Sequence, residues 1–258
     1  MCLILFAWRT HPAHALIVAA NRDEFFERPS LPAAWWDDHP EILAGRDLTA
    51  RGTWLGVTRT GRFASITNYR NPAERMDNAP SRGQLVTDFL TSAGPPSAHF
   101  SGIAPRAQQY NGFSMLAADA RSLAFYSNRE GVVREVETGV HGLSNHLLDT
   151  PWPKVVKGKE RLADVLSRRF DPEACLEMLA DAEPAHDRHL PETGVGLERE
   201  RKLSSIRIAD SYYGTRCSTV FRLDADGMAE FWERSYGPDG GAIGTVHFSF
   251  RVPEPDRS

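Results

Sequence analysis

The sequence predicts an α+β protein in which antiparallel strands and helices fall into separate blocks. Short apolar runs bounded by turn residues occupy both ends of the chain, and segments with helical spacing lie between them. Strand and helix do not alternate strictly, which favours layers of antiparallel sheet over a parallel sheet. The sequence contains no Gly-x-Gly-x-x-Gly turn and no P-loop, so a nucleotide-binding α/β fold has no support.

Composition is typical of an ordinary soluble globular protein. Of the 258 residues, 41% are hydrophobic and 25% are charged, and no repeat or linker divides the chain, so we expect one domain over residues 1–258. A net charge of -4 argues against a general nucleic-acid binder. No apolar run approaches the roughly 18 residues of a membrane span, and no signal-peptide pattern opens the chain. We therefore expect a cytoplasmic protein without stable membrane insertion.

The chain opens with a predicted β-hairpin. Residues 3–8 and 15–20 are almost unbroken apolar runs, joined by the turn-prone Thr10-His11-Pro12. Both runs are too short for helices, so they favour two buried strands that pair with each other.

A second hairpin is predicted over residues 53–58 and 63–68, around a turn that contains Gly61. Residues 71–81 are rich in Pro, Asn and charge and indicate an exposed loop. Apolar side chains then recur at helical spacing, which predicts a helix over residues 83–92.

The middle of the chain predicts an antiparallel meander over residues 113–118, 123–127 and 132–136, followed by a short stretch at 139–145. Two further helices are expected, at 153–170 and 172–179, and the first of them begins with a proline. The longest predicted loop covers residues 182–203. The last three predicted strands cover residues 218–223, 229–232 and 245–252.

Cys2 is the first residue that could carry out chemistry. The three cysteines form no Cys-x-x-Cys pair, which argues against a zinc site and a disulfide framework. Removal of Met1 would leave Cys2 with its thiol beside a free α-amine, two groups whose reference pKa values lie at about 8 to 8.5. This arrangement predicts an N-terminal nucleophile that uses its own amine as base. The alternative is a small apolar residue that opens a buried strand.

The polar cluster Asn21-Arg22-Asp23-Glu24 directly follows the second apolar run. If the first two runs pair as a hairpin, the end of the second lies beside the start of the first, and the cluster lies next to Cys2. Arg22 could then hold a thiolate or a substrate carboxylate, and Asp23 could orient the α-amine. The alternative is a solvated turn.

Other polar features favour ordinary surface structure. The run Arg199-Glu200-Arg201-Lys202 carries both signs of charge and is typical of a solvated helix or loop. His11 with His14, and His186 with His189, have the spacing i, i+3 but no accompanying cysteine pair. We expect surface or turn histidines there and no bound metal.

Several motifs together resemble the NRDE-motif family, also called the transport and Golgi organisation protein family. They follow the family's order: Met-Cys at the start, NRDE at 21–24, GLSN at 142–145, LDTPWPK at 148–154, LPETGVG at 190–196, LSSI at 203–206 and YGTR at 213–216. The resemblance covers nearly the whole chain. Animal members of this family have been linked to secretory organisation, to mitochondrial lipid and acyl-CoA metabolism, and to haem trafficking.

The family in turn is similar to the N-terminal-nucleophile hydrolases, particularly the cysteine branch with penicillin V acylase and bile-salt hydrolase. That resemblance implies a four-layer αββα sandwich and assigns the nucleophile to Cys2. It also implies an arginine and an aspartate at the end of the second strand. The branch spaces them Arg-Asn-x-Asp, whereas Arg22 and Asp23 are adjacent here.

The same resemblance implies three more site residues. Asn68 and Asn145 occupy places that match the two oxyanion asparagines of that branch, although the proline after the second comes several residues later here. Arg216 corresponds to a late arginine that follows a serine in the branch, whereas Arg216 precedes Ser218.

These assignments imply a hydrolase or acyltransferase that acts on an amide or thioester of a small-molecule acyl substrate. The Cys2 thiolate attacks, the α-amine moves the proton, Asn68 with Asn145 stabilises the oxyanion, and no cofactor is required. The alternative is non-catalytic binding and trafficking of a hydrophobic ligand such as haem. Trp35 and Trp36 would wall that pocket, with a histidine or Cys2 as axial ligand. A scaffold with a vestigial site is a third interpretation, and the oligomeric state stays open.

Overall fold

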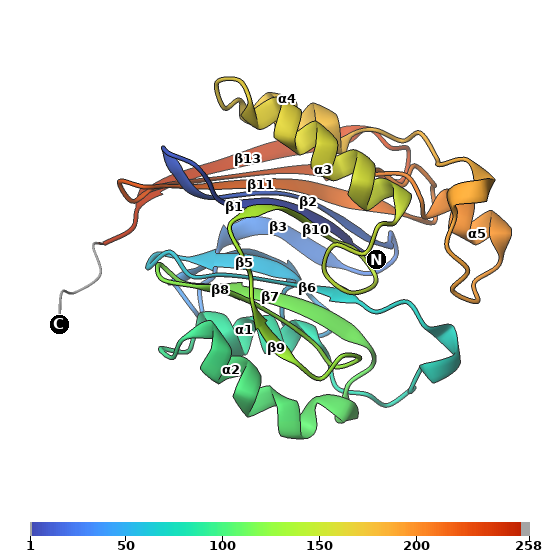
Figure 1. The fold of residues 1–258 in the computed structure, drawn as a ribbon, viewed down its shortest axis with the longest axis horizontal. Helices are drawn as coiled ribbons and strands as arrows, with labels where there is room; N and C mark the ends of the chain where they lie inside the picture. Colours follow the sequence, from blue (N-terminus) through green and yellow to red (C-terminus); the bar gives the residue numbers. More distant parts are fainter. Residues whose placement is uncertain (1, 254–258) are drawn as a thin grey trace.

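Two antiparallel β-sheets lie face to face in the computed structural model, which describes residues 2–253 (Figure 1). The six-stranded sheet contains, in spatial order, β10 (Gly139–Leu143), β1 (Cys2–His11), β2 (His14–Phe25), β11 (Tyr213–Asp224), β12 (Met228–Tyr236) and β13 (Ala242–Arg251). The seven-stranded sheet contains β3 (Ser30–Trp35), β4 (Ile42–Asp47), β5 (Leu55–Thr58), β6 (Phe63–Asn68), β7 (Phe113–Ala118), β8 (Leu123–Ser127) and β9 (Val133–Glu135).

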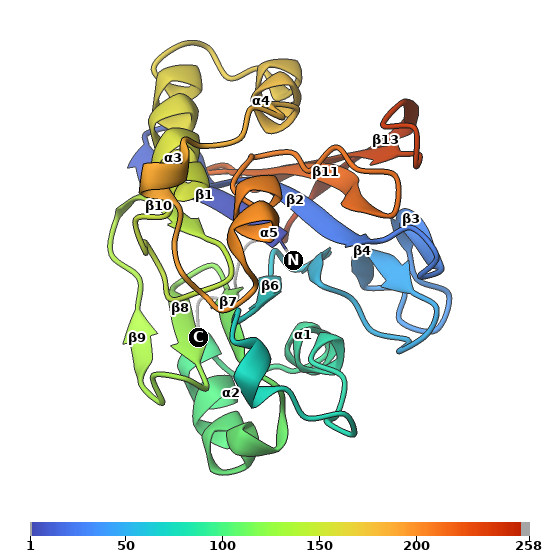
Figure 2. The ribbon, with the colours of Figure 1, turned by 90° about the vertical axis from the view of Figure 1, so that its right-hand side faces the viewer.

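Helices cover the outer face of each sheet, so the fold has the expected αββα layers. The six-stranded sheet is covered by α3 (Pro153–Leu166) and α4 (Pro172–Leu179), and the seven-stranded sheet by α1 (Gly83–Leu90) and α2 (Pro96–Ile103) (Figure 1). Figure 2 places α5 (Leu197–Lys202) at the end of the molecule where β1 begins. Short 3-10 turns occur at Pro72–Glu74, Ala104–Gln109 and Asp187–His189. Within residues 2–253, no helix is long and apolar enough to cross a membrane.

Alternation along β1 decides which way Cys2 faces. Ile4 and Phe6 are fully buried in the core between the sheets, whereas Leu3 and Leu5 pack in a separate core under α3 and α4. Successive strand residues point to opposite faces, so Cys2 shares the inner face with Ile4 and Phe6. Fully burying one such side chain stabilises the fold by roughly 1.5 to 3 kcal/mol, and this fixes the register of the strand.

The structure confirms the two early hairpins, the meander and the first helix. It also corrects several expectations. The predicted loop over 182–203 contains a 3-10 turn and α5, and the helix that starts at Pro153 ends at Leu166, before residue 170. Strand β11 begins at Tyr213 instead of residue 218, and β3, β4 and α2 had no counterpart among the predicted elements.

Candidate functional site

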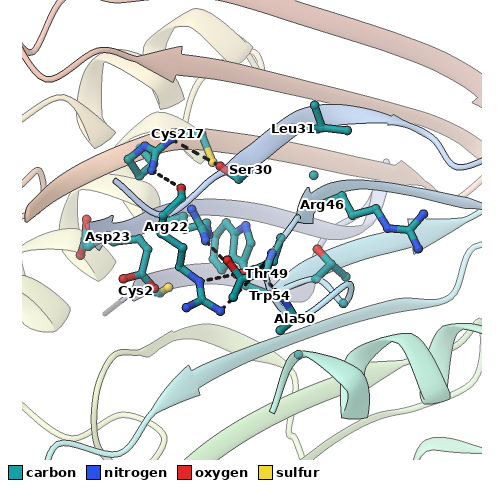
Figure 3. Close-up of a pocket in the computed structure, with 18 of the residues that line it drawn as sticks. Cys2, Arg22, Asp23, Ser30, Leu31, Arg46, Thr49, Ala50, Trp54 and Cys217 are labelled. Atoms are coloured by element: carbon teal, nitrogen blue, oxygen red, sulfur yellow. Dashed lines mark hydrogen bonds and ion pairs between the residues drawn. The ribbon is translucent and has the colours of Figure 1, made fainter. Parts of the chain in front are cut away.

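The first residue of β1 lies in a row of side chains that crosses the six-stranded sheet. Cys2 pairs with Arg22 of β2, and Cys217 of β11 pairs with Arg22 from the other side. Directly paired residues point to the same face of a sheet, so the arginine stands between two thiols (Figure 3). The next partner in the row is Ser235 of β12.

An extra residue in β11 decides which of its side chains face the space between the sheets. Thr215 pairs with Asp23 and Cys217 pairs with Arg22, which leaves Arg216 as a bulge. Residues two apart normally share a face, but a bulge reverses that relation. Thr215 therefore points to the helix side of the sheet, while Cys217 points into the space between the sheets.

The row forms the floor of a cavity of about 880 Å³, a volume typical of small-molecule sites. Its walls come from β3, β4, the loop before α1 and the start of β13. Around Cys2 the lining is polar and charged, and towards β13 it includes the exposed apolar side chains Leu31 and Ile243. Charged residues of the lining include Arg22, Glu24, Arg28, Arg46, Asp47, Asp77, Arg82, Arg216 and Glu233.

Cys2 is 8% exposed, at the inner end of this cavity. Burial raises the pKa of the Cys2 thiol above its usual value, and the Asp23 carboxylate acts in the same direction. The guanidinium of Arg22 and the backbone N–H of Asp23, which donates to the sulfur, oppose that rise in pKa. Both stabilise the thiolate, which is the nucleophilic form.

Arg22 is held beside the thiol by an acidic residue of the opposite sheet. Its Nη2 lies 3.6 Å from Oδ2 of Asp47, and the same oxygen accepts a hydrogen bond of 2.6 Å from Nε of Arg28. Because Asp47 is engaged mainly by Arg28, Arg22 retains donors for the thiolate or for an anionic group in the cavity.

Asp23 faces the helix side of the sheet, where its surroundings are dry. Its Oδ1 accepts a hydrogen bond of 2.6 Å from Oγ1 of Thr215, and its backbone carbonyl accepts one of 3.1 Å from the Tyr213 hydroxyl. Burial raises the pKa of the Asp23 carboxyl, and the nearby Lys154 ammonium opposes the rise. Because Arg22 and Asp23 are adjacent, their side chains lie on opposite faces of the strand. An arginine and an aspartate spaced Arg-Asn-x-Asp, three residues apart, would also lie on opposite faces.

The two candidate oxyanion asparagines are neighbours, but only one lines the cavity. Asn68 is part of the cavity wall. Asn145 is 0% exposed, and its Nδ2 donates a hydrogen bond of 3.1 Å to the backbone carbonyl of Asn68. Its Oδ1 accepts one of 3.3 Å from Nη2 of Arg70. Asn145 therefore lies behind the cavity wall, where it holds the end of β6 in place.

Arg216 lines the cavity as well, and its guanidinium holds the loop after β2 in place. Its Nη1 donates hydrogen bonds of 2.9 Å to the carbonyls of Phe25 and Arg28, and its guanidinium lies over the Phe26 ring, 5.1 Å from the centroid. It therefore fixes the shape of the wall that carries Arg28.

Sequence reasoning missed two buried groups of the site region. Cys217 is not among the predicted site residues, but it lines the cavity and forms a hydrogen bond with the buried carboxyl of Glu233. Glu200, within a run interpreted as solvated, is 3% exposed and accepts a hydrogen bond of 2.6 Å from Arg70. A cysteine directly after the YGTR motif was the one available signal for Cys217.

The tryptophans predicted to wall the pocket lie elsewhere. Trp36 packs in the outer core of the seven-stranded sheet, and Trp35 packs against Phe250 at a ring separation of 5.1 Å. Trp54 lines the cavity in their place. Among residues 2–253, no histidine lines this cavity and no group of three or more His, Cys, Asp or Glu side chains is arranged to hold a metal ion.

The solved structures to which this chain is similar include two hydrolases. The mutant C2A conjugated bile acid hydrolase from Clostridium perfringens superposes with a TM-score of 0.50 over 98% of each chain, at 8% identity. An N-acylethanolamine-hydrolysing acid amidase orthologue from Caenorhabditis elegans gives a TM-score of 0.41 at 10% identity, over 96% of this chain and 100% of that chain. The first similarity shows that the fold is that of the N-terminal-nucleophile hydrolases.

Curated relatives match over nearly their whole length. The Transport and Golgi organization protein 2 homolog of Bos taurus is 36% identical, over 98% of this chain and 99% of its own. The Homo sapiens homolog is 36% identical, over 91% of this chain and 93% of its own. The Drosophila melanogaster protein is 25% identical, over 91% of this chain and 92% of its own. The sequence profile of the family described as Transport and Golgi organisation 2 matches residues 1–238, and the chain belongs to that family.

Proposed function

We propose that this protein is an N-terminal-cysteine hydrolase or acyltransferase that acts on an amide or thioester bond, with Cys2 as nucleophile after removal of Met1. The observation that carries the proposal is the placement of the Cys2 sulfur. It lies at a cavity, beside the guanidinium of Arg22, and accepts a hydrogen bond from the backbone N–H of Asp23. Burial raises the pKa of this thiol, and the guanidinium and the backbone donor oppose that rise and favour the thiolate.

The reaction would proceed in two balanced steps. The α-amine of Cys2 accepts the thiol proton, and the sulfur forms a bond to the acyl carbon. The bond from that carbon to the amide nitrogen or thioester sulfur breaks, and the protonated amine returns the proton to the leaving group. Water, or another acceptor, then attacks the acyl-enzyme and releases the acyl group and the Cys2 thiol.

Asn68 is the candidate donor to the oxyanion, because it belongs to the cavity wall. Asn145 acts indirectly, because its side chain donates a hydrogen bond to the backbone carbonyl of Asn68 and so positions that residue. Loss of one oxyanion donor typically costs about 3 to 4 kcal/mol of transition-state stabilisation. The fold shared with a conjugated bile acid hydrolase supports the same class of chemistry.

The test is turnover by the mature chain on a panel of acyl amides and acyl thioesters. Cys2→Ala should abolish turnover, since no other group replaces the sulfur. Cys175→Ala is the matched control, because Cys175 belongs to α4, is buried in the core between this helix and the sheet, and does not line the cavity. Undiminished turnover by Cys2→Ala would contradict the proposal.

The second candidate function is non-catalytic binding of a hydrophobic ligand such as haem. It is favoured by the apolar side chains Leu31 and Ile243 at the β13 end of the cavity, which are 53% and 72% exposed. The cavity lining offers the sulfur atoms of Cys2 and Cys217 as candidate axial ligands. A haem titration tests it: a Soret shift that is lost in Cys2→Ala supports this function, and an unshifted Soret band in the wild-type protein contradicts it.

A further inference from the structure

Arg82 is a charged residue of the cavity wall that the reaction above does not use. It directly precedes α1 and is half-buried. Its Nη1 donates a hydrogen bond of 2.9 Å to the backbone carbonyl of Gly112, and the same carbonyl accepts one of 2.9 Å from the backbone N–H of Tyr69. The shared acceptor holds the guanidinium beside the end of β6, where Asn68 is the last residue.

The other donors of this guanidinium are free in the part of the chain that the structure describes. Among residues 2–253, no carboxylate forms an ion pair with Arg82, and its Nε and Nη2 make no hydrogen bond. Neither nitrogen is one of the buried polar atoms that lack a partner, so both are accessible to solvent. Because Arg82 lines the cavity, these two donors are open to a group that enters it.

The charge of Arg82 lacks the compensation that another arginine of the lining receives. Arg46 donates hydrogen bonds of 2.5 and 2.6 Å to the carboxylate of Asp38. For Arg82, burial lowers the pKa of the guanidinium, and the Glu24 carboxylate opposes this fall. A partly desolvated cation with free donors gains free energy when an anion binds to it.

The backbone at Arg82 is held by close packing. Helix α1 begins at Gly83, and a Cβ atom on Gly52 would lie 2.7 Å from the carbonyl carbon of Gly83. That separation leaves no room for a side chain at position 52, so the start of α1 is fixed against the cavity wall. A donor on a fixed backbone loses less conformational freedom when it binds a ligand, and the two free donors are therefore preorganised.

We propose that Arg82 is a specificity residue of this cavity: its Nε and Nη2 bind an anionic oxygen group, such as a carboxylate, of the acyl substrate. These two nitrogens form one edge of the guanidinium, which matches a carboxylate in bidentate geometry. The same edge of Arg201 binds Asp187 in this way, at 2.8 and 2.7 Å. The inference rests on the proposed function, because it makes the bound anion part of the substrate.

Modification of the wild-type protein by phenylglyoxal, an arginine reagent, tests the anion site without turnover. At about ten times its dissociation constant, hexanoate should slow the labelling of Arg82 roughly tenfold, whereas 1-hexanol, which lacks the charge, should not. Peptide mapping supplies Arg59 as an internal control, because Arg59 donates to the carbonyl of Pro40 and lies outside the cavity lining. Equal slowing of both arginines by hexanoate, or no slowing of Arg82, would overturn the proposal.

A set of amides of nearly equal size then identifies which part of the substrate carries the anion. N-propylbutanamide is neutral, N-propylsuccinamate carries a carboxylate on the acyl part, and N-butyryl-β-alanine carries one on the leaving group. One of the two anionic amides should show a KM about tenfold below that of the neutral amide, because a charge-assisted hydrogen bond is gained on binding. Arg82→Gln should abolish this difference and leave kcat nearly unchanged, and Arg59→Gln should preserve it. A preference for the anionic amide that survives Arg82→Gln would overturn the proposal.

Failure of this inference and failure of the proposed function give different results. If hexanoate does not protect Arg82 although the mature chain turns over amides, only the role of Arg82 is overturned. If hexanoate protects Arg82 but no amide or thioester is turned over, the anion site stands and the hydrolase proposal is contradicted.

Discussion

Arg22 lies directly opposite Cys2 in the pairing of β1 with β2, and both side chains line the same cavity. Both faces of the two strands are apolar, and their side chains divide between the core that lies between the sheets and the core under α3 and α4. A guanidinium beside a thiol stabilises the thiolate, so the first hairpin of the fold is also the structure that prepares the nucleophile.

Replacement of Arg22 should slow the reaction of Cys2 with thiol reagents. Arg22→Gln removes the cation that lowers the pKa of the thiol, and we expect about a tenfold slower alkylation at neutral pH. Arg234→Gln is the control, because Arg234 belongs to the same sheet and pairs with Glu173 at 2.8 Å. Equal alkylation rates in Arg22→Gln and wild type would show that the guanidinium does not act on the sulfur.

The three cysteines should differ in reactivity. Burial raises the pKa of Cys175 to about 12, and burial followed by the Glu233 charge raises the pKa of Cys217 well above its usual value. Cys2 has a cation and a backbone donor in opposition to burial. Peptide mapping after brief alkylation at neutral pH should find the label on Cys2 first. Label that accumulates first on Cys217 would reverse the assignment of the nucleophile.

The buried ion pair between Arg70 and Glu200 should stabilise the fold only while both partners are present. Glu200→Gln strands a buried guanidinium, and we expect a loss of about 3 to 5 kcal/mol in the free energy of unfolding, measured by urea titration. Asp187→Asn breaks the exposed pair with Arg201 and should leave the free energy of unfolding nearly unchanged. Comparable losses in the two variants would mean that Glu200 is solvated, as its sequence context predicts.

Asp149 should make stability depend on acid pH. Partial burial raises its pKa, but hydrogen bonds from His141 and Lys159 outweigh this effect and lower the pKa of Asp149 to about 2. Its stabilisation is therefore present above the unfolded pKa of about 4 and is lost as the pH falls towards about 2. Because the side chain is 32% exposed, we expect a contribution of about 1 kcal/mol.

The measurement is urea unfolding of wild type and Asp149→Asn between neutral pH and about pH 2. The difference between them should shrink with acidification. A difference that stays constant over this range would contradict the lowered pKa.

Sequence periodicity was enough to place Cys2 beside Arg22, because two short apolar runs with a turn between them have one favourable pairing. It could not place α2, whose apolar residues Phe100 and Ile103 are too few to give a helical pattern, nor the mixed polar strands β3 and β4 at the sheet edge.

Inside the site, local backbone geometry limited what the sequence could predict. The bulge at Arg216 reverses the faces of Thr215 and Cys217, and nothing in the spacing of these residues predicts it. Similarly, a charge run predicts solvent exposure, and only the long-range partner Arg70 explains why Glu200 is buried. Motif matching placed Asn145 near the site, but its position behind Asn68 depends on a long-range hydrogen bond from the segment after β10 to the end of β6.

The central claim is that the mature chain begins at Cys2, and the intact mass of the protein purified from its native source tests it most directly. The account predicts a mass that lacks Met1 and a single fast-reacting thiol that peptide mapping assigns to the N-terminal residue. Retention of Met1 in the native protein would contradict it, because the α-amine that serves as base would then lie on the wrong residue.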